Sequence, residues 1–330
     1  MNKRLFLSGL LAFLTLPFLS AAQSPKGGDF SRIDEHARSV QLRQYDSLEV
    51  FTKQVLLTPC QTDLEKVRAI FVWLTEHIAY DCKKYWNRPV ATYTYTTEEE
   101  YQQQYQAFID KNLSQTLKRG RGVCEDYSRL FEKMCRYAGV QARHIAGFAR
   151  FSAADMGRLP EGTNHTWNSF RIDDQWYLVD VTWAAGYVND DVSQFTKAFT
   201  EYHFMMPPAD FAADHYPEDP ADQLLPVPIS PEAFAAQPYY YPLYWQLGIE
   251  EVSYHPVPND KKQVQVFVRT RYPVDPEDIA VIQGEDALLF GFEKTENGYA
   301  GIVTPKKGLN LLVMMRTQDN LYEPVMEGKW

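Results

Sequence analysis

Apolar residues recur at helical spacing in two segments of the first half of the chain. In residues 62–77 they share one face, and a Thr-Asp pair at the start can cap the helix. In residues 123–138 the same spacing returns, and Gly139 follows where a helix would end. The polar stretch between them, residues 83–121, combines a loop with helical spacing around residues 98–117. We therefore predict two amphipathic helices and a third, more polar one.

Alternating apolar and polar positions then predict strands. The segments are residues 140–152, 165–172 and 176–182. If the turn between the last two consists of Asp173-Asp174, Trp167 lies opposite Asp180. His165 is then the diagonal neighbour of Asp180 on the same face, within reach of an imidazole and a carboxylate. A slip of one residue would place the two side chains on opposite faces, so the prediction depends on an even loop length.

Prolines mark a change of pattern in the second half of the chain. Nine of the 20 prolines lie between Pro207 and Pro242, a density typical of a wrapping segment and linker. Short alternating segments follow, with Asn297-Gly298 as a turn signal, in the pattern of an all-β sandwich. The predicted strands are residues 263–268, 279–282, 288–292, 299–303 and 309–315.

The N-terminus has the pattern of a secretory signal peptide. Two basic residues precede an apolar run, residues 5–19, and the small residues Ser20-Ala21-Ala22 fit a peptidase site before Gln23. The run is short for a bilayer span, and a retained membrane anchor is the alternative. We therefore predict an exported protein, in the periplasm or outside the cell.

Composition narrows the function classes. The 330 residues are 45% hydrophobic, enough for more than one buried core. A formal net charge of −10 gives no electrostatic reason to bind nucleic acid or anionic lipid. Beyond the N-terminal run, no apolar stretch approaches the roughly 18 residues of a membrane span. Because the sequence lacks CxxC, HExxH, P-loop and GxGxxG motifs, and its histidines show no metal-ligand spacing, we predict no metal and no cofactor.

Four cysteines in an exported protein raise the question of disulfides. Cys60 and Cys82 flank the helix of residues 62–77, whose ends lie about 20 Å apart, too far for a bridge. Cys124 and Cys135 lie about three turns apart on one helix and cannot pair either. The remaining pairings stay open, and we favour free thiols.

Cys124 lies in the first turn of the second apolar helix, just after Gly122. Free backbone N–H groups and the positive end of the helix dipole favour a thiolate there. The glycine lets another backbone or a substrate approach closely. Cys135 falls within the apolar stripe and is predicted to be a packing residue. The alternative is that Cys124, like Cys135, is a buried structural thiol.

His165 and Asp180 complete an arrangement for nucleophilic catalysis. His165 would take the Cys124 proton, and Asp180 would fix the imidazole tautomer and support its charge. The thiolate would attack a carbonyl carbon to form a thioester, with the oxyanion facing the Cys124 N–H and a second donor that the sequence does not identify. Trp167 and Trp183 flank the pair, where they either shield it from water or pack in the core.

Three motifs, in this order, resemble the transglutaminase-like superfamily. They are Gly-Val-Cys-Glu-Asp-Tyr-Ser around Cys124, Asn-His-Thr-Trp-Asn around His165 and Trp-Tyr-Leu-Val-Asp-Val-Thr-Trp around Asp180. The resemblance covers roughly residues 60–226 and points to the branch that includes kyphoscoliosis peptidase and the bacterial transglutaminase-like proteins. It implies an α+β, papain-like core in which a helix bearing the cysteine packs on an antiparallel sheet bearing the other two residues.

The resemblance and the patterns together predict five regions. They are a signal peptide (1–22), an N-terminal extension (23–59), a transglutaminase-like catalytic domain (60–226), a Pro-rich linker (227–245) and a β-rich C-terminal domain (246–330). The last is interpreted as a substrate- or wall-binding module, or else as a passive lid.

The leading functional hypothesis is an exported cysteine peptidase that hydrolyses peptide or isopeptide bonds of a protein, or of a cell-wall peptide. Its predicted catalytic triad is Cys124, His165 and Asp180, and its candidate lining residues are Gly122, Trp167 and Trp183. One alternative is a protein-crosslinking transglutaminase with the same acyl-enzyme. The other is a non-catalytic envelope scaffold that retains the triad.

Overall fold

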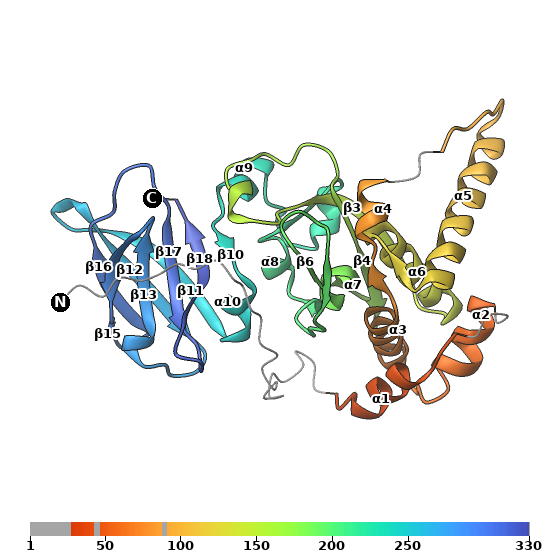
Figure 1. The fold of residues 1–330 in the computed structure, drawn as a ribbon, viewed down its shortest axis with the longest axis horizontal. Coiled ribbons are helices and arrows are strands. Elements are labelled where there is room, and N and C mark those ends of the chain that lie inside the picture. Colours follow the sequence, from red (N-terminus) through yellow and green to blue (C-terminus); the bar gives the residue numbers. More distant parts are fainter. Residues whose placement is uncertain (1–27, 43–46, 88–90, 330) are drawn as a thin grey trace.

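The structure is a computed structural model that describes residues 28–42, 47–87 and 91–329. The predicted signal peptide lies outside these ranges. The chain forms an α+β part and a β-rich part, which follow one another along the long axis of the molecule (Figure 1). In the described ranges, none of the helices is both long and apolar enough to cross a membrane.

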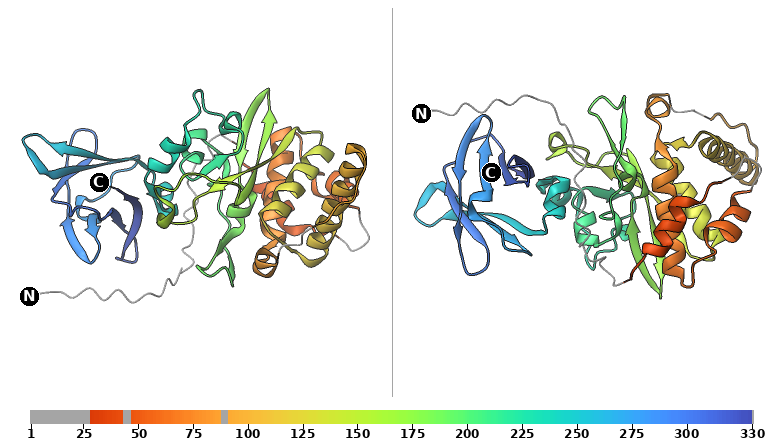
Figure 2. Two further views of the ribbon diagram at one scale, coloured as in Figure 1. Left: turned by 90° about the horizontal axis from the view of Figure 1, so that it is seen from above. Right: turned by 60° about the horizontal axis from the view of Figure 1, so that its bottom comes forward.

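Five antiparallel strands form the central sheet of the α+β part, in the order β8-β5-β4-β3-β9. Their bounds are β3 Ala142–Ala149, β4 His165–Ile172, β5 Gln175–Val179, β8 Phe204–Met206 and β9 His215–Pro217. Two further two-stranded sheets are parallel β1 Ala79–Tyr80 with β2 Arg121–Gly122, and antiparallel β6 Gly186–Val188 with β7 Phe195–Lys197. Long helices cover one face of the central sheet, and the chain that follows β8 covers the other (Figure 2).

Most of the described helices belong to this part. They are α1 Ser31–Ser39, α2 Leu48–Phe51, α3 Asp63–His77, α4 Cys82–Trp86, α5 Glu98–Arg119, α6 Cys124–Tyr137, α7 Val181–Ala185 and α8 Pro208–Phe211. Single turns of π or 3-10 helix occur at Thr52–Leu56, Ala153–Asp155, Pro220–Gln223 and, in the β-rich part, Pro276–Asp278. The predicted helices are α3, α5 and α6; α3 begins with a capping box between Thr62 and Glu65. Helix α6 ends before Gly139, whose φ of 78° suits glycine.

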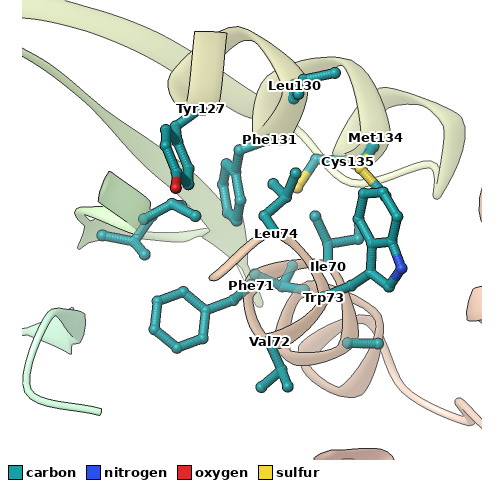
Figure 3. Close-up of a cluster of buried hydrophobic side chains, with 14 of the residues drawn as sticks. Ile70, Phe71, Val72, Trp73, Leu74, Tyr127, Leu130, Phe131, Met134 and Cys135 are labelled. Carbon is teal, nitrogen blue, oxygen red and sulfur yellow. The ribbon is translucent and has the colours of Figure 1, made fainter. Parts of the chain in front are cut away.

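Helices α3 and α6 pack against each other at the centre of the hydrophobic core (Figure 3). Ile70 and Leu74 of α3 face Phe131 and Cys135 of α6, and all four side chains are fully buried. Cys135 is therefore the packing residue that the sequence predicts. Helices α1 and α2 join the same cluster, so the stretch before α3 contributes to this core. This contact fixes the axis of α6, and with it the position of Cys124 at the start of the helix.

The hairpin of β4 and β5 has the register that the sequence predicts. Asp173 and Asp174 form its two-residue loop with φ values of 48° and 64°, as a type I′ turn requires. The strand stops at Val179, however, and residues 181–182, predicted as strand, begin α7 instead. Asp180 causes this change because its side chain accepts hydrogen bonds from two backbone N–H groups of α7 and caps the helix.

Two antiparallel sheets share one hydrophobic core in the β-rich part, as expected for a sandwich. One has the order β10-β18-β17-β13-β14, with bounds Tyr239–Tyr240, Tyr322–Gly328, Leu311–Arg316, Ile279–Gln283 and Asp286–Phe290. The other has the order β11-β12-β16-β15, with bounds Ile249–Val257, Asp260–Thr270, Tyr299–Val303 and Glu293–Lys294. The sequence did not predict β10, β11, β15 or β18. Charged residues in the last three, and a proline in β11 and in β18, break the alternation there.

The predicted Pro-rich linker contains two short helices, α9 Pro231–Ala236 and α10 Pro242–Gln246. Proline occupies the first position of each, where its fixed φ and missing N–H fit a helix start. The segment is therefore structured, and the domain boundaries drawn from the sequence stay predictions.

Candidate active site

Cys124 is the first residue of α6, and polar neighbours hold this helix start in place. The Asp126 carboxylate accepts a hydrogen bond from the Val123 N–H (2.8 Å) and also binds Lys84 Nζ (2.7 Å). N–H groups in the first turn of a helix have no acceptor within the helix. The start of α6 therefore presents backbone donors and the positive end of its dipole beside the Cys124 thiol.

Gly122 is needed for close packing behind the cysteine. It lies in β2, opposite Tyr80 of β1. A Cβ atom at this position would lie 2.7 Å from Thr116 Cγ2 and 2.8 Å from Asp126 Cβ. The close approach predicted at this glycine therefore exists, and the side chains of Thr116 and Asp126 are the groups that make it.

The structure brings the three predicted catalytic residues together. His165 opens β4, Asp180 follows β5, and the distance from His165 Nε2 to Asp180 Oδ2 is 2.7 Å. Because Nε2 faces the carboxylate, Nδ1 is the ring nitrogen left for Cys124, whose side chain is hydrogen-bonded to His165. Cys124, His165 and Asp180 are 2%, 3% and 0% exposed, so bulk water does not compete for these bonds.

In the pair of His165 and Asp180, the opposite charges shift the two pKa values more than burial does. Burial alone would lower the pKa of His165, but the charge and hydrogen bond of Asp180, with a further contribution from Cys124, raise it to about 10. Burial alone would raise the pKa of Asp180, yet His165 and its hydrogen bond hold that pKa well below the ordinary value. His165 is therefore an imidazolium and Asp180 a carboxylate at neutral pH.

The Asp180 carboxylate accepts four hydrogen bonds. Oδ1 accepts from the N–H groups of Thr182 (2.8 Å) and Trp183 (3.0 Å). Oδ2 accepts from His165 and also from His215 Nε2, at 3.2 Å. A buried charge of this kind is tolerated only where such partners replace water.

His215 is a member of this site that the sequence interpretation missed. It lies in β9, beside Ala149 of β3, and its Nδ1 is 2.5 Å from Asp214 Oδ1. No spacing rule connects His215 to Asp180, which lies 35 residues earlier in the chain. Only the pairing of β3 with β9 places it there.

His165, Asp180 and His215 also offer ligand atoms within 4.8 Å of one another, close enough to be considered for a metal ion. Both oxygens of Asp180 already accept two hydrogen bonds each, and a metal would have to replace the protons that both imidazoles share with Oδ2. We therefore assign the three residues to a hydrogen-bonded network. The expectation of no metal stays a prediction.

Aromatic rings surround His165. Trp183 is half-buried and stacks on the imidazole, with ring centroids 5.3 Å apart. Trp167 is fully buried and packs edge-on against His215 at 4.9 Å. Phe151, which the sequence interpretation missed, is 52% exposed and lies 6.0 Å from His165 and 5.9 Å from Trp183. Trp183 and Phe151 thus lie on the solvent side of the imidazole, and Trp167 belongs to the core behind it.

The other cysteines are unsuited to the same chemistry. Cys60, Cys82 and Cys135 are free thiols, as Cys124 is, so the preference for free thiols over disulfides agrees with the structure. Burial raises the pKa of Cys60 to about 11 and the pKa of Cys135 far above its ordinary value. Of these four thiols, the one that is hydrogen-bonded to the His165 imidazolium is that of Cys124.

The charged pair predicts a loss of stability at alkaline pH. The pKa of His165 in the folded protein, about 10, exceeds its ordinary value. Its charged form therefore contributes stability that is complete below about pH 6.5 and is lost as pH rises through about 10. We expect urea unfolding to show a difference in free energy between the wild type and His165→Gln that is largest near pH 6.5 and shrinks towards pH 10. A difference that stays constant over this range would contradict the charged pair.

Known proteins resemble this chain over the region that holds these residues. A family model described as the transglutaminase-like superfamily matches residues 52–181, which include Cys124, His165 and Asp180. Kyphoscoliosis peptidase of Homo sapiens is 32% identical over 231 residues, which is 66% of this chain and 32% of that protein. Hillarin of Drosophila melanogaster is 22% identical over 291 residues, 83% of this chain and 32% of that protein.

This chain thus spans about a third of the length of either relative. A solved crystal structure of a TGase aligns with 53% of this chain and 37% of its own, at 16% identity and a TM-score of 0.28. Residues 52–181 thus form a transglutaminase-like domain.

Proposed function

We propose that this protein is an exported thiol enzyme that forms an acyl-enzyme at Cys124 and hydrolyses peptide or isopeptide bonds. The observation that carries the proposal is the buried set of hydrogen bonds from Cys124 through His165 to Asp180 inside a transglutaminase-like domain. A nucleophile, a base and a group that orients the base are the parts that acyl transfer requires.

The proposed reaction begins with the Cys124 proton on His165 Nδ1 and a thiolate on Sγ. The thiolate attacks the amide carbonyl carbon, and the resulting oxyanion faces the backbone N–H of Cys124 at the start of α6. As the carbon–nitrogen bond breaks, the imidazolium gives its proton to the leaving amine. A thioester remains on Cys124, and His165 is neutral.

Hydrolysis then restores the enzyme. Neutral His165 takes a proton from water, and the hydroxide attacks the thioester carbon. The sulfur–carbon bond breaks, which releases a carboxylic acid and the Cys124 thiolate. Asp180 keeps the imidazole in one orientation and supports its charge at both steps. If an amine attacks the same thioester in place of water, the product is a new amide, which is the transglutaminase reaction.

Three observations support hydrolysis of a protein or peptide amide. The human relative is named as a peptidase, and a chain of net charge −10 does not attract nucleic acid. The active-site imidazole is also approached past two aromatic side chains, Phe151 and Trp183, which suit an apolar side chain next to the scissile bond. A cell-wall peptide is one substrate of this kind for an exported protein.

We expect Cys124→Ala to abolish amide hydrolysis and Asp180→Asn to lower kcat by about 1,000-fold, because the imidazole loses its charged partner. Cys60→Ser, which changes a thiol remote from His165, should retain wild-type activity. The measurement is release of free amine from a protein digest, with mass spectrometry of the thioester on Cys124. Incorporation of an added amine with release of ammonia would identify a transferase instead. If no thioester forms and no peptide is hydrolysed, the protein is instead the non-catalytic scaffold.

The export part of the proposal has its own test. We expect the mature protein, recovered from cells that express the full chain, to begin at Gln23 because the small residues before it fit a signal-peptidase site. N-terminal sequencing of the protein from periplasm or medium measures this directly. An intact N-terminus in the cytoplasmic fraction would contradict export.

A further inference from the structure

We propose that His215 is a positioning residue of this site: as a second imidazolium, it holds Asp180 beside His165 and sets the pH range in which the Cys124–His165 pair is charged. The inference deepens the proposed function and rests on it for its kinetic test, although the charge on His215 can be measured without it.

The hydrogen bonds of His215 require two N–H groups. Nε2 lies 3.2 Å from Asp180 Oδ2, and Nδ1 lies 2.5 Å from Asp214 Oδ1. An ionised carboxylate accepts hydrogen bonds but donates none, and a neutral imidazole carries only one N–H. With both carboxylates ionised, both contacts are therefore satisfied only when the ring is protonated at both nitrogens.

The surroundings of His215 favour this charge. Burial alone would lower its pKa, but Asp214 and Asp180 outweigh burial and raise it. A third buried histidine in this region, His203, has a pKa that burial lowers to about 4, so its ring is neutral. The remaining neighbours of the ring are aromatic: Phe211 at 4.0 Å, Trp183 at 4.5 Å and Trp167 at 4.9 Å. Two buried imidazoliums thus face two carboxylates, of which Asp180 is fully buried and Asp214 mostly buried.

A second positive charge changes the titration of the catalytic pair. The rings of His215 and His165 lie 5.6 Å apart, so a charge on one acts directly on the other. A nearby cation favours the thiolate over the thiol and disfavours the imidazolium. His215 therefore moves both the formation of the Cys124 thiolate and the deprotonation of His165 to lower pH. Without it, the ion pair would form and break at higher pH.

Asp214 allows the charge to be separated from the hydrogen bond. Its side chain is mostly buried but lies at the edge of the network, and an asparagine there keeps its shape. In Asp214→Asn, a neutral His215 with its proton on Nε2 still donates to Asp180. In His215→Gln, both the charge and the ring are lost. His203→Gln is the matched control, since it removes a buried histidine of the same region that carries no charge.

The first arm of the test is nitrogen NMR of the full chain with labelled histidine, with the His215 signals assigned by their loss in His215→Gln. At about pH 7.5, one unit above the ordinary value for histidine, we expect two imidazolium signals from His215 in the wild type and a neutral ring in Asp214→Asn. A neutral His215 ring in the wild type would overturn the proposal.

The second arm is the rate of alkylation of Cys124 against pH, which needs no substrate. The acid limb of this profile is the pH range in which the rate falls because the thiolate becomes protonated. We expect this limb to move up by about one pH unit in Asp214→Asn and in His215→Gln, and to stay in place in His203→Gln. If His215 has a purely structural role, its substitution changes the maximal alkylation rate or the stability of the protein. The acid limb of Asp214→Asn then lies at the same pH as in the wild type, and this result would also overturn the proposal. If wild-type Cys124 lacks such a limb, the thiol chemistry itself fails, and the NMR arm still decides the charge on His215.

Discussion

The buried carboxylate of Asp180 is the constraint on which the rest of the site depends. A charge without water costs several kcal/mol unless hydrogen bonds and opposite charges replace the solvent. Three separate parts of the chain supply them: β4 through His165, the first turn of α7 through two N–H groups, and β9 through His215. An error in any of these parts would leave the charge unpaired, so the network also enforces the local fold.

The scaffold around this carboxylate positions the thiol. Packing of α3 on α6 sets the axis of the helix that begins at Cys124, and the Ser128 hydroxyl ties α6 to the Trp167 carbonyl of β4 (2.8 Å). On the other side, the buried guanidinium of Arg150 donates to the Ala213 and Phe234 carbonyls and holds the chain that leads to His215. The transglutaminase-like core thus carries the thiol at the start of α6, His165 at the start of β4 and Asp180 between β5 and α7. The β-rich part follows this core in the chain.

Much of this arrangement is local in the sequence and could be predicted from it. Apolar spacing predicted α3 and α6, and an even loop of Asp173-Asp174 placed His165 near Asp180 because side chains alternate along strands. The end of β5 was missed because Asp180 is both a strand neighbour and a helix cap, and periodicity cannot separate the two. His215 and Phe151 were missed for another reason: they reach His165 through the pairing of β3 with β9 and the loop after β3, which no short motif encodes.

The proposed chemistry depends on Asp180 and His165 keeping Cys124 as a thiolate. The most direct measurement is the rate of alkylation of Cys124 against pH, followed by peptide mass mapping, in the wild type and in His165→Ala. We expect rapid modification that persists well below about pH 8.5, the ordinary range of a thiol, and that is lost in the variant. Slow modification that follows an ordinary or buried thiol in both proteins would contradict it.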